Sequence, residues 1–142
     1  MTPRLDYRTA APKLYQAMLG LERAVDSSGL EHSLIKLVKT RASQINGCAW
    51  CIDMHTRDAR RSGETEARLY LLNAWRERAA LAWTEALTLV AQTHAPDADY
   101  DALKPHFSEE EIAQLTMLIV TINGWNRIAI GFRASPPLDP AA

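Results

Sequence analysis

The sequence predicts an all-α fold, and three observations support this prediction. Apolar residues recur at spacings of three and four through most of the 142-residue chain, which is the period of an amphipathic helix. No segment alternates apolar and polar residues as a half-buried strand does. Apolar residues make up 47% of the chain and charged residues 23%, which is enough apolar material for a core. We assign one domain to residues 1–142 and exclude a disordered or fibrous chain.

The first helix is expected to begin at Pro12 and to end near Gly29. Proline is favoured in the first turn of a helix, where its missing N–H has no partner to lose. One face of this segment carries the apolar residues Leu14, Met18, Leu21 and Val25. The preceding residues 1–12 show no apolar pattern, and we expect an extended tail there.

Two further helices are expected around the cysteines. The first runs from about residue 31 to residue 45, and the Asn46-Gly47 pair after it is typical of a left-handed helix end. Its apolar stripe consists of Leu34, Val38, Ala42 and Ile45. The next helix is expected to begin at the cysteines and to run to Ser62, because Gly63 is a residue that ends helices.

The following segment is harder to divide into elements. A helical pattern continues from residue 65 to about residue 93, and it fits one helix or two. Residues 94–105 contain Pro96 and several aspartates, which indicates a surface loop. The proline-rich residues 135–142 are expected to form a second extended tail.

A long last helix is expected to begin at Ser108 and to run to about Ile130. Ser108 and Glu111 have the spacing of a capping box. The helix is apolar nearly all round, with Ile112, Leu115, Ile119 and Ile122 on one stripe and Ala113, Met117 and Val120 on other sides. Such a helix must be covered by its own chain or by a second subunit. We therefore expect a homo-oligomer, and a central core helix is the alternative.

Charge and hydropathy exclude two classes of partner. The net charge is −1, without the basic excess that nucleic-acid-binding proteins usually carry, so we expect no nucleic acid. The longest uncharged stretch, residues 112–126, is shorter than the roughly 20 apolar residues of a spanning helix, so we expect no membrane segment. The N-terminus lacks the apolar run of a secretory signal, which predicts a cytoplasmic protein.

Cys48, Cys51 and His55 are predicted to share one face of a helix. At about 100° per residue they fall within a sector of about 60°, and Asp53 and Arg57 lie on the opposite side. The helix N-terminus stabilises a thiolate at either cysteine. The second thiol can then attack the sulfenic acid that a peroxide leaves, which closes a disulfide and releases water. His55 can move the proton in this reaction.

Two other interpretations of the C-x-x-C-x-x-x-H spacing remain open. A zinc site would need a fourth ligand or an open catalytic position, and the remaining histidines, His32, His94 and His106, are distant in sequence. The cysteines can also be two small buried residues beside a core histidine. A disulfide between such close cysteines would enclose too short a loop to stabilise the fold, so their use is local chemistry or none.

Residues 41–55, RASQINGCAWCIDMH, with residues 58–60 and 63–64, resemble the AhpD-like alkylhydroperoxidases of the carboxymuconolactone decarboxylase superfamily. The similarity continues through residues 80–85 and 122–127. The resemblance implies an all-α bundle of about five to six helices that forms a homo-oligomer, commonly a trimer or hexamer. It also implies a peroxidase that acts on organic hydroperoxides without a cofactor and is restored by a thiol or dithiol reductant.

The resemblance also assigns roles to single residues. Cys51 is the attacking thiol, Cys48 is the resolving thiol that is more accessible to the reductant, and His55 belongs to the proton relay. The family relay also has a glutamate twelve positions before the first cysteine, and this chain has Lys36 there. Trp50 replaces a second relay histidine. If Lys36 faces the thiols, its charge favours the thiolate but cannot accept a proton, so we expect weak activity that Lys36→Glu would raise.

Three functions therefore follow from the sequence. The leading one is a thiol peroxidase or disulfide reductase that uses the cysteine pair. The others are a non-catalytic oligomeric relative of the fold, which would not turn over peroxide, and a metal-dependent enzyme, which metal analysis would reveal. Trp75, Trp83 and Trp125 are expected to pack in the core or an interface. Glu85 and Arg127 are weaker candidates for charge partners of the site.

Overall fold

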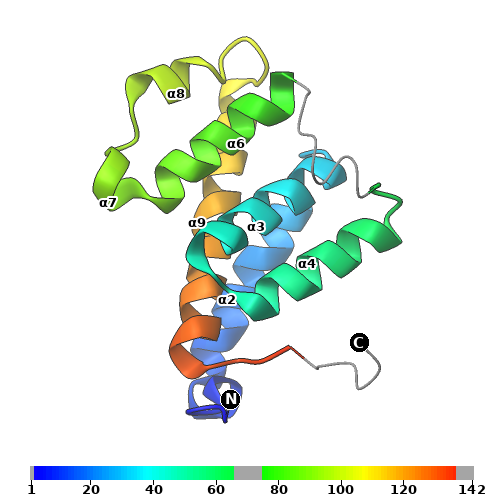
Figure 1. Ribbon diagram of the computed structural model, residues 1–142, viewed down its shortest axis with the longest axis vertical. Coiled ribbons are helices and arrows are strands. Elements are labelled where there is room, and N and C mark those ends of the chain that lie inside the picture. Colours follow the sequence, from blue (N-terminus) through cyan, green and yellow to red (C-terminus); the bar gives the residue numbers. More distant parts are fainter. Residues whose placement is uncertain (1, 66–74, 137–142) are drawn as a thin grey trace.

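The computed structural model describes residues 2–65 and 75–136, which form eight helices and no strand (Figure 1). Five helices are long, namely α2 (Pro12–Asp26), α3 (His32–Asn46), α4 (Ala49–Arg61), α6 (Trp75–Thr88) and α9 (Glu109–Phe132). Three are short, namely α1 (Tyr7–Ala10), α7 (Val90–Thr93) and α8 (Asp97–Asp101). The predicted all-α fold class is confirmed.

Helices α3 and α9 hold the bundle together. α3 contacts α4, α6 and α9, and α9 also contacts α2, α4 and α6. Figure 1 shows α2 beside α9 along the long axis, with α3, α4 and α6 crossing them obliquely. The N-terminal segment lies against the end of α9, where the Arg4 amide donates a 3.0 Å hydrogen bond to the Phe132 carbonyl.

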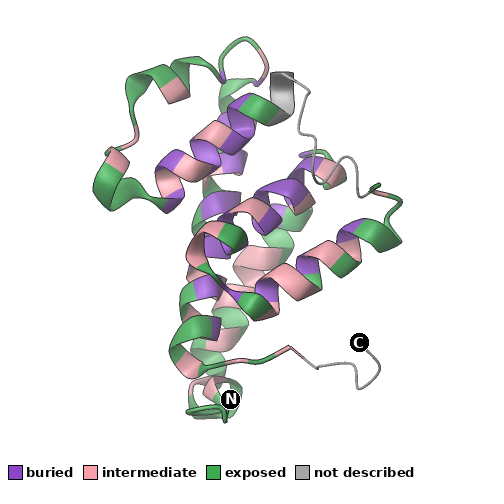
Figure 2. Ribbon diagram, in the orientation of Figure 1, coloured by how far each residue is buried: buried purple, intermediate pink, exposed green. Residues whose placement is uncertain are grey.

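The main core lies between α3, α6 and the first half of α9. Figure 2 shows buried residues concentrated on the facing sides of these helices. Leu34 and Val38 on α3 and Leu115 and Leu118 on α9 are fully buried there. Each such side chain contributes about 1.5–3 kcal/mol through removal of apolar surface from water. A second, smaller cluster surrounds the cysteines and consists of Ala42, Cys48, Cys51, Ile122 and Ala129.

The long helices begin and end close to the predicted residues. α2 starts at Pro12, and α3 ends at Gly47, which adopts the left-handed φ of 67° that glycine accommodates without strain. The capping box at Ser108 forms and opens α9 as predicted. The predicted apolar face of α2 is wrong in one position, because Leu14 is 72% exposed.

The expectation of an extended tail over residues 1–12 is wrong for α1. The side chain of Asp6 caps this helix by accepting a hydrogen bond from the Arg8 amide at 3.1 Å. The Tyr7 ring stacks on Phe132 with a centroid distance of 5.4 Å. This partner lies at the other end of the sequence, so the local pattern carries no sign of it.

The expected loop over residues 94–105 contains the short helix α8. Asp97 and Asp99 lie in its first turn, where negative charge is favourable to the helix dipole. Leu103 follows the helix and is fully buried, which anchors the segment to the core. The aspartates that suggested a loop are therefore also residues that favour a helix start.

Parts of two predictions lie outside the described residues. The second half of the helical pattern predicted over residues 65–93 corresponds to α6 and α7. Residues 66–74 of this pattern lie outside the described residues. The predicted C-terminal tail is described only at Ser135 and Pro136, which are not helical.

Helix α9 is long and apolar enough to cross a membrane by length and composition alone. In this chain it is the central core helix, and 44% of its most apolar stretch is buried by α2, α3, α4 and α6. Its uncovered apolar side chains include Met117, Val120 and Ile130, which are 44%, 52% and 46% exposed. Within residues 2–65 and 75–136, these side chains of α9 are therefore left partly uncovered.

Candidate redox site

The turn between α3 and α4 positions the two cysteines. After Gly47 the chain reverses, and the Cys48 amide donates a 3.0 Å hydrogen bond to the Ser43 carbonyl. Cys48 is the N-cap residue of α4, with extended φ and ψ of −85° and 93°, and Cys51 lies in the first turn. Both sulfurs are therefore at a helix N-terminus, where backbone N–H groups lack helical partners.

The two thiols are close together and buried. Their Sγ atoms are 2.9 Å apart, and both cysteines are free. Cys48 is 1% exposed and Cys51 is 2% exposed. A disulfide bond is about 2.05 Å long, so the pair is reduced and is placed to form a disulfide with little movement.

The surroundings give the two thiols different acidities. The pKa of Cys48 is lowered to about 7, first by the hydrogen bond from the Cys51 thiol and then by the amides of Cys51 and Trp50 and by Asn126, against a burial effect that raises it. The pKa of Cys51 is raised, because its thiol donates to Cys48 and because burial and the Cys48 charge disfavour a second thiolate. The thiolate of the pair therefore forms at Cys48, and Cys51 keeps its proton.

His55 lies one helical turn after Cys51 and is 6% exposed, as the predicted inward-facing thiol face requires. Burial first, and then the nearby charge of Lys39, lower its pKa to about 4. The imidazole is thus neutral at pH 7, so one ring nitrogen can accept a proton while the other donates one. Its Nε2 atom is buried without a hydrogen-bond partner, which leaves that atom free for a reacting group.

Asn126 on α9 is a fully buried amide beside the thiols. Its Oδ1 accepts from Asn46 Nδ2 at 2.9 Å, and its Nδ2 donates to Ser43 Oγ at 3.0 Å. Ser43 Oγ itself donates to the Lys39 carbonyl at 2.7 Å, so it is an acceptor for Asn126. The second N–H of the Asn126 amide remains for the sulfurs, and it lowers the pKa of Cys48.

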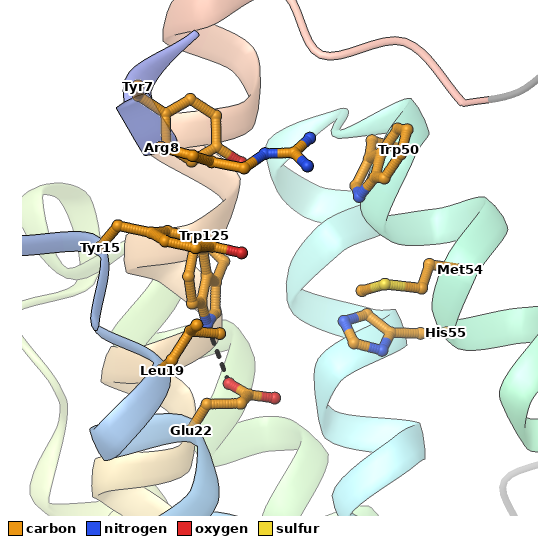
Figure 3. A pocket seen from close by; sticks show the side chains of 9 residues that line it. All are labelled: Tyr7, Arg8, Tyr15, Leu19, Glu22, Trp50, Met54, His55 and Trp125. Carbon is orange, nitrogen blue, oxygen red and sulfur yellow. Dashed lines mark hydrogen bonds between the residues drawn. The ribbon is translucent and has the colours of Figure 1, made fainter. Parts of the chain in front are cut away.

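A cavity of about 310 Å³ lies beside the site (Figure 3). Its lining consists of the aromatic residues Tyr7, Tyr15, Trp50 and Trp125 with Arg8, Leu19, Glu22, Met54 and His55. Around α4, counted from Cys48, Met54 lies at about 240°, Cys51 at about 300° and His55 at about 340°. Cys51 is therefore on the cavity side of α4, between two residues that line it.

Glu22 supplies a carboxylate to the cavity from α2. Its Oε1 accepts from Lys39 Nζ at 2.5 Å, and its Oε2 accepts from Trp125 Nε1 at 2.9 Å. Lys39 is itself buried and also contacts Asp26 at 2.8 Å. The sequence prediction missed Glu22, although one signal was present, because Glu22 lies four residues after Met18 on the apolar face of α2.

Lys36 does not contact the cysteines. Its Nζ donates to the Asp58 carbonyl at 3.0 Å and also bonds the Ser62 hydroxyl, both at the C-terminal end of α4. Asp58 is seven residues after Cys51, which is about 10 Å along the helix axis. The expectation that Lys36 faces the thiols at ~4–6 Å is therefore not met. Lys36 instead places a positive charge at the C-terminal end of α4, where it is favourable to the helix dipole.

Glu85 and Arg127, the other candidate charge partners of the cysteine site, contact other residues. Glu85 forms an ion pair with Arg41, whose Nη2 lies 2.7 Å from its Oε1. Arg127 donates from Nη1 to the Asn123 carbonyl at 2.9 Å, beside the asparagines that surround Asn126. Trp83 packs in the core as predicted. Within the described ranges 2–65 and 75–136, no three His, Cys, Asp or Glu side chains are grouped as a metal site would require.

Known proteins resemble the chain over most of its length. The model of the carboxymuconolactone decarboxylase family matches residues 12–95. The uncharacterized protein YdfG of Bacillus subtilis (strain 168) is 41% identical over 138 residues, which cover 92% of this chain and 94% of that protein. Both matches include the two cysteines and His55 within their span.

Solved structures share the fold. A protein of unknown function from Agrobacterium tumefaciens, described as a candidate antioxidant defence protein AhpD, is 45% identical, with a TM-score of 0.92 over 97% of this chain and 100% of that chain. A peroxidase-related protein from Ralstonia eutropha JMP134 with an alkylhydroperoxidase AhpD core has a TM-score of 0.79 at 19% identity, over 92% and 74% of the two chains. The chain therefore belongs to the carboxymuconolactone decarboxylase family and has the AhpD-like fold.

Proposed function

We propose that the protein reduces organic hydroperoxides by cycling Cys48 and Cys51 between dithiol and disulfide. The observation that carries this proposal is the pair of free thiols 2.9 Å apart at the N-terminus of α4, beside a neutral His55. A dithiol in this geometry supplies both electrons for the reduction of a peroxide, so no cofactor is required. The AhpD descriptions of the related structures support the same chemistry.

In the first step, a cysteine sulfur attacks the distal oxygen of the hydroperoxide ROOH. We assign this attack to Cys51, as the resemblance predicts, because Cys51 lies on the cavity side of α4. Because the free thiolate forms more readily at Cys48, the Cys48 thiolate at 2.9 Å takes the Cys51 proton as the Cys51 sulfur attacks. The O–O bond breaks, Cys51 becomes a sulfenic acid, and the alkoxide leaves as the alcohol ROH with the proton that Cys48 returns through neutral His55.

In the second step, the Cys48 thiolate attacks the sulfur of the Cys51 sulfenic acid. The S–O bond breaks, and the hydroxide leaves as water after taking a proton from solvent. The dithiol with one thiolate, ROOH and one proton thus become the disulfide, ROH and water. A thiol or dithiol reductant then restores the pair, which is consistent with a cytoplasmic protein whose cysteines are kept reduced.

The direct test is a titration of free thiols before and after one equivalent of cumene hydroperoxide. We expect the wild type to lose both thiols and Cys48→Ser to hold a sulfenic acid at Cys51, detected by mass after a trapping reagent. An adduct on Cys48 in Cys51→Ser, with none in Cys48→Ser, would reverse the roles of the sulfurs. Unchanged thiols in the wild type would favour the non-catalytic relative of the fold.

A further inference from the structure

The cavity beside His55 indicates which organic hydroperoxides the protein takes, an inference that rests on the proposed function. Its volume of about 310 Å³ holds a small organic molecule. Figure 3 shows Tyr15, Trp125 and Glu22 on one wall, with Trp50, Met54 and His55 on α4 opposite them. A molecule in the cavity therefore lies between aromatic side chains, with its reacting end toward the cysteine-bearing face of α4.

The aromatic wall is a fixed surface. The Tyr15 ring packs edge-on against Tyr7 at 5.8 Å and against Trp125 at 6.0 Å between centroids. Trp125 is held further by its hydrogen bond to Glu22. Rings that are immobilised by each other bind a flat apolar group at little cost in side-chain entropy, because few rotamers remain to be lost.

Arg8 adds a positive charge to the lining of the cavity. Figure 3 shows its guanidinium pointing toward Trp50. Its carboxylate contact is with Asp6 at 4.0 Å, which is too long for a hydrogen bond, and the Arg8 side chain is 59% exposed. The carboxylate of Glu22 deeper in the cavity is already paired with Lys39. Arg8 therefore keeps donors for an anion that enters the cavity.

We propose that the preferred substrates are aromatic hydroperoxides that carry a carboxylate at the end of the ring opposite the hydroperoxide group. The ring lies between Trp50 and Tyr15. The hydroperoxide group faces Cys51 and His55, and the carboxylate pairs with Arg8. Aliphatic hydroperoxides of the same charge lack the ring contacts, and neutral aromatic ones lack the ion pair.

The test measures binding by calorimetry with alcohols that cannot oxidise the thiols. The matched pair is 2-phenylpropan-2-ol and 4-(2-hydroxypropan-2-yl)benzoate, titrated into the reduced wild type at low ionic strength. We expect the carboxylate to bind about two- to fivefold more tightly, as a largely exposed ion pair allows. Arg8→Gln removes this preference. Lys13→Gln keeps it, because that variant loses the same charge at an exposed position of α2 that does not line the cavity.

Trp50→Leu tests the aromatic part of the proposal. We expect this substitution to weaken the binding of both alcohols by a similar factor of about two to ten. Equal affinities in the wild type, a preference that survives in Arg8→Gln, or no binding of either alcohol would overturn the inference. No thiol reacts in these titrations, so the two proposals fail separately. Loss of the preference for the carboxylate would overturn the substrate inference but not the proposed peroxidase activity. Thiols that do not react with the hydroperoxide would overturn the peroxidase activity but not the binding preference.

Discussion

Cys48 and Cys51 have the same side chain but different surroundings. Cys48 is the N-cap of α4, and its pKa is lowered first by the hydrogen bond with the Cys51 thiol. Cys51 donates this hydrogen bond, and its pKa is raised also because a second buried charge is costly. Asn126 contributes to both thiols from another helix, with its amide held by Asn46 and Ser43. The acidity of the pair is thus set by hydrogen bonds to the charged form as well as by burial.

We predict that Asn126→Leu raises the pKa of Cys48 by about one unit, because the thiolate loses an amide donor. The ultraviolet absorbance of the thiolate against pH measures this shift. Asn123→Leu is the matched control, since Asn123 lies on the same helix and also receives a 2.9 Å hydrogen bond from Asn46. Equal shifts in the two variants would show a general loosening of the asparagine cluster.

The lowered pKa of His55 makes the free energy of unfolding decrease as the pH falls. Its pKa is about 4 when folded, against 6.5 for an ordinary histidine, so between these values the unfolded chain binds a proton that the folded chain does not. The stability contribution of neutral His55 is complete above 6.5 and is lost as the pH falls toward 4, by about 3 kcal/mol. Urea unfolding of His55→Asn should show a flatter pH dependence across this window than the wild type. Parallel curves would contradict the assignment.

At the scale of elements, α4 is stabilised at both ends. Cys48 occupies the N-cap position, and Lys36 from α3 places its ammonium on the carbonyl of Asp58 and the hydroxyl of Ser62 near the last turn. Positive charge at the C-terminal end of a helix is favourable to the helix dipole. Lys36 therefore anchors the helix that carries the cysteines.

We predict that Lys36→Met lowers the free energy of unfolding by about 0.5–1.5 kcal/mol, because the end of α4 loses these hydrogen bonds. The pKa of Cys48 should stay near 7. Urea denaturation and thiolate absorbance measure the two quantities, and Lys13→Met, at an exposed position, is the control. If Lys36→Glu instead raises both the peroxide rate and the thiol pKa, Lys36 acts on the thiols as first predicted.

In the whole molecule, the described residues leave one side of α9 uncovered. Ala113, Met117 and Val120 are exposed and follow one another at spacings of four and three residues, so they form a stripe along one side of the helix. The opposite side of α9 is filled by fully buried Leu115 and Leu118. A second subunit over this stripe would bury apolar surface that the described part of the chain leaves exposed.

We predict that the protein is a homo-oligomer in which this stripe is buried. Light scattering at micromolar concentration should give a multiple of 15.9 kDa. Val120→Lys places a charge in the stripe and should reduce the mass, because an unpaired charge in an apolar interface is costly to desolvate. Gln92→Lys, at an exposed position of α7, should leave the mass unchanged. A wild-type mass of 15.9 kDa would contradict the prediction.

The features that depend on neighbours along the chain can be predicted from the sequence. Pro12, Gly47 and the capping box at Ser108 set helix ends because they act on the backbone within a few residues. The spacing of Cys48, Cys51 and His55 placed them on one inward face because helical periodicity is local. The fold class and the composition of the cysteine face followed from such patterns.

The residues that meet this face from other helices are set by the way the helices pack. Glu22 and Asn126 reach it from α2 and α9, and Arg8 reaches the cavity from α1, where the sequence indicated a tail. Lys36 was assigned to the thiols by its position in the family pattern, yet its flexible side chain lies at the other end of α4. Contacts between residues distant in sequence depend on how the helices cross, and helical periodicity carries no information about that crossing.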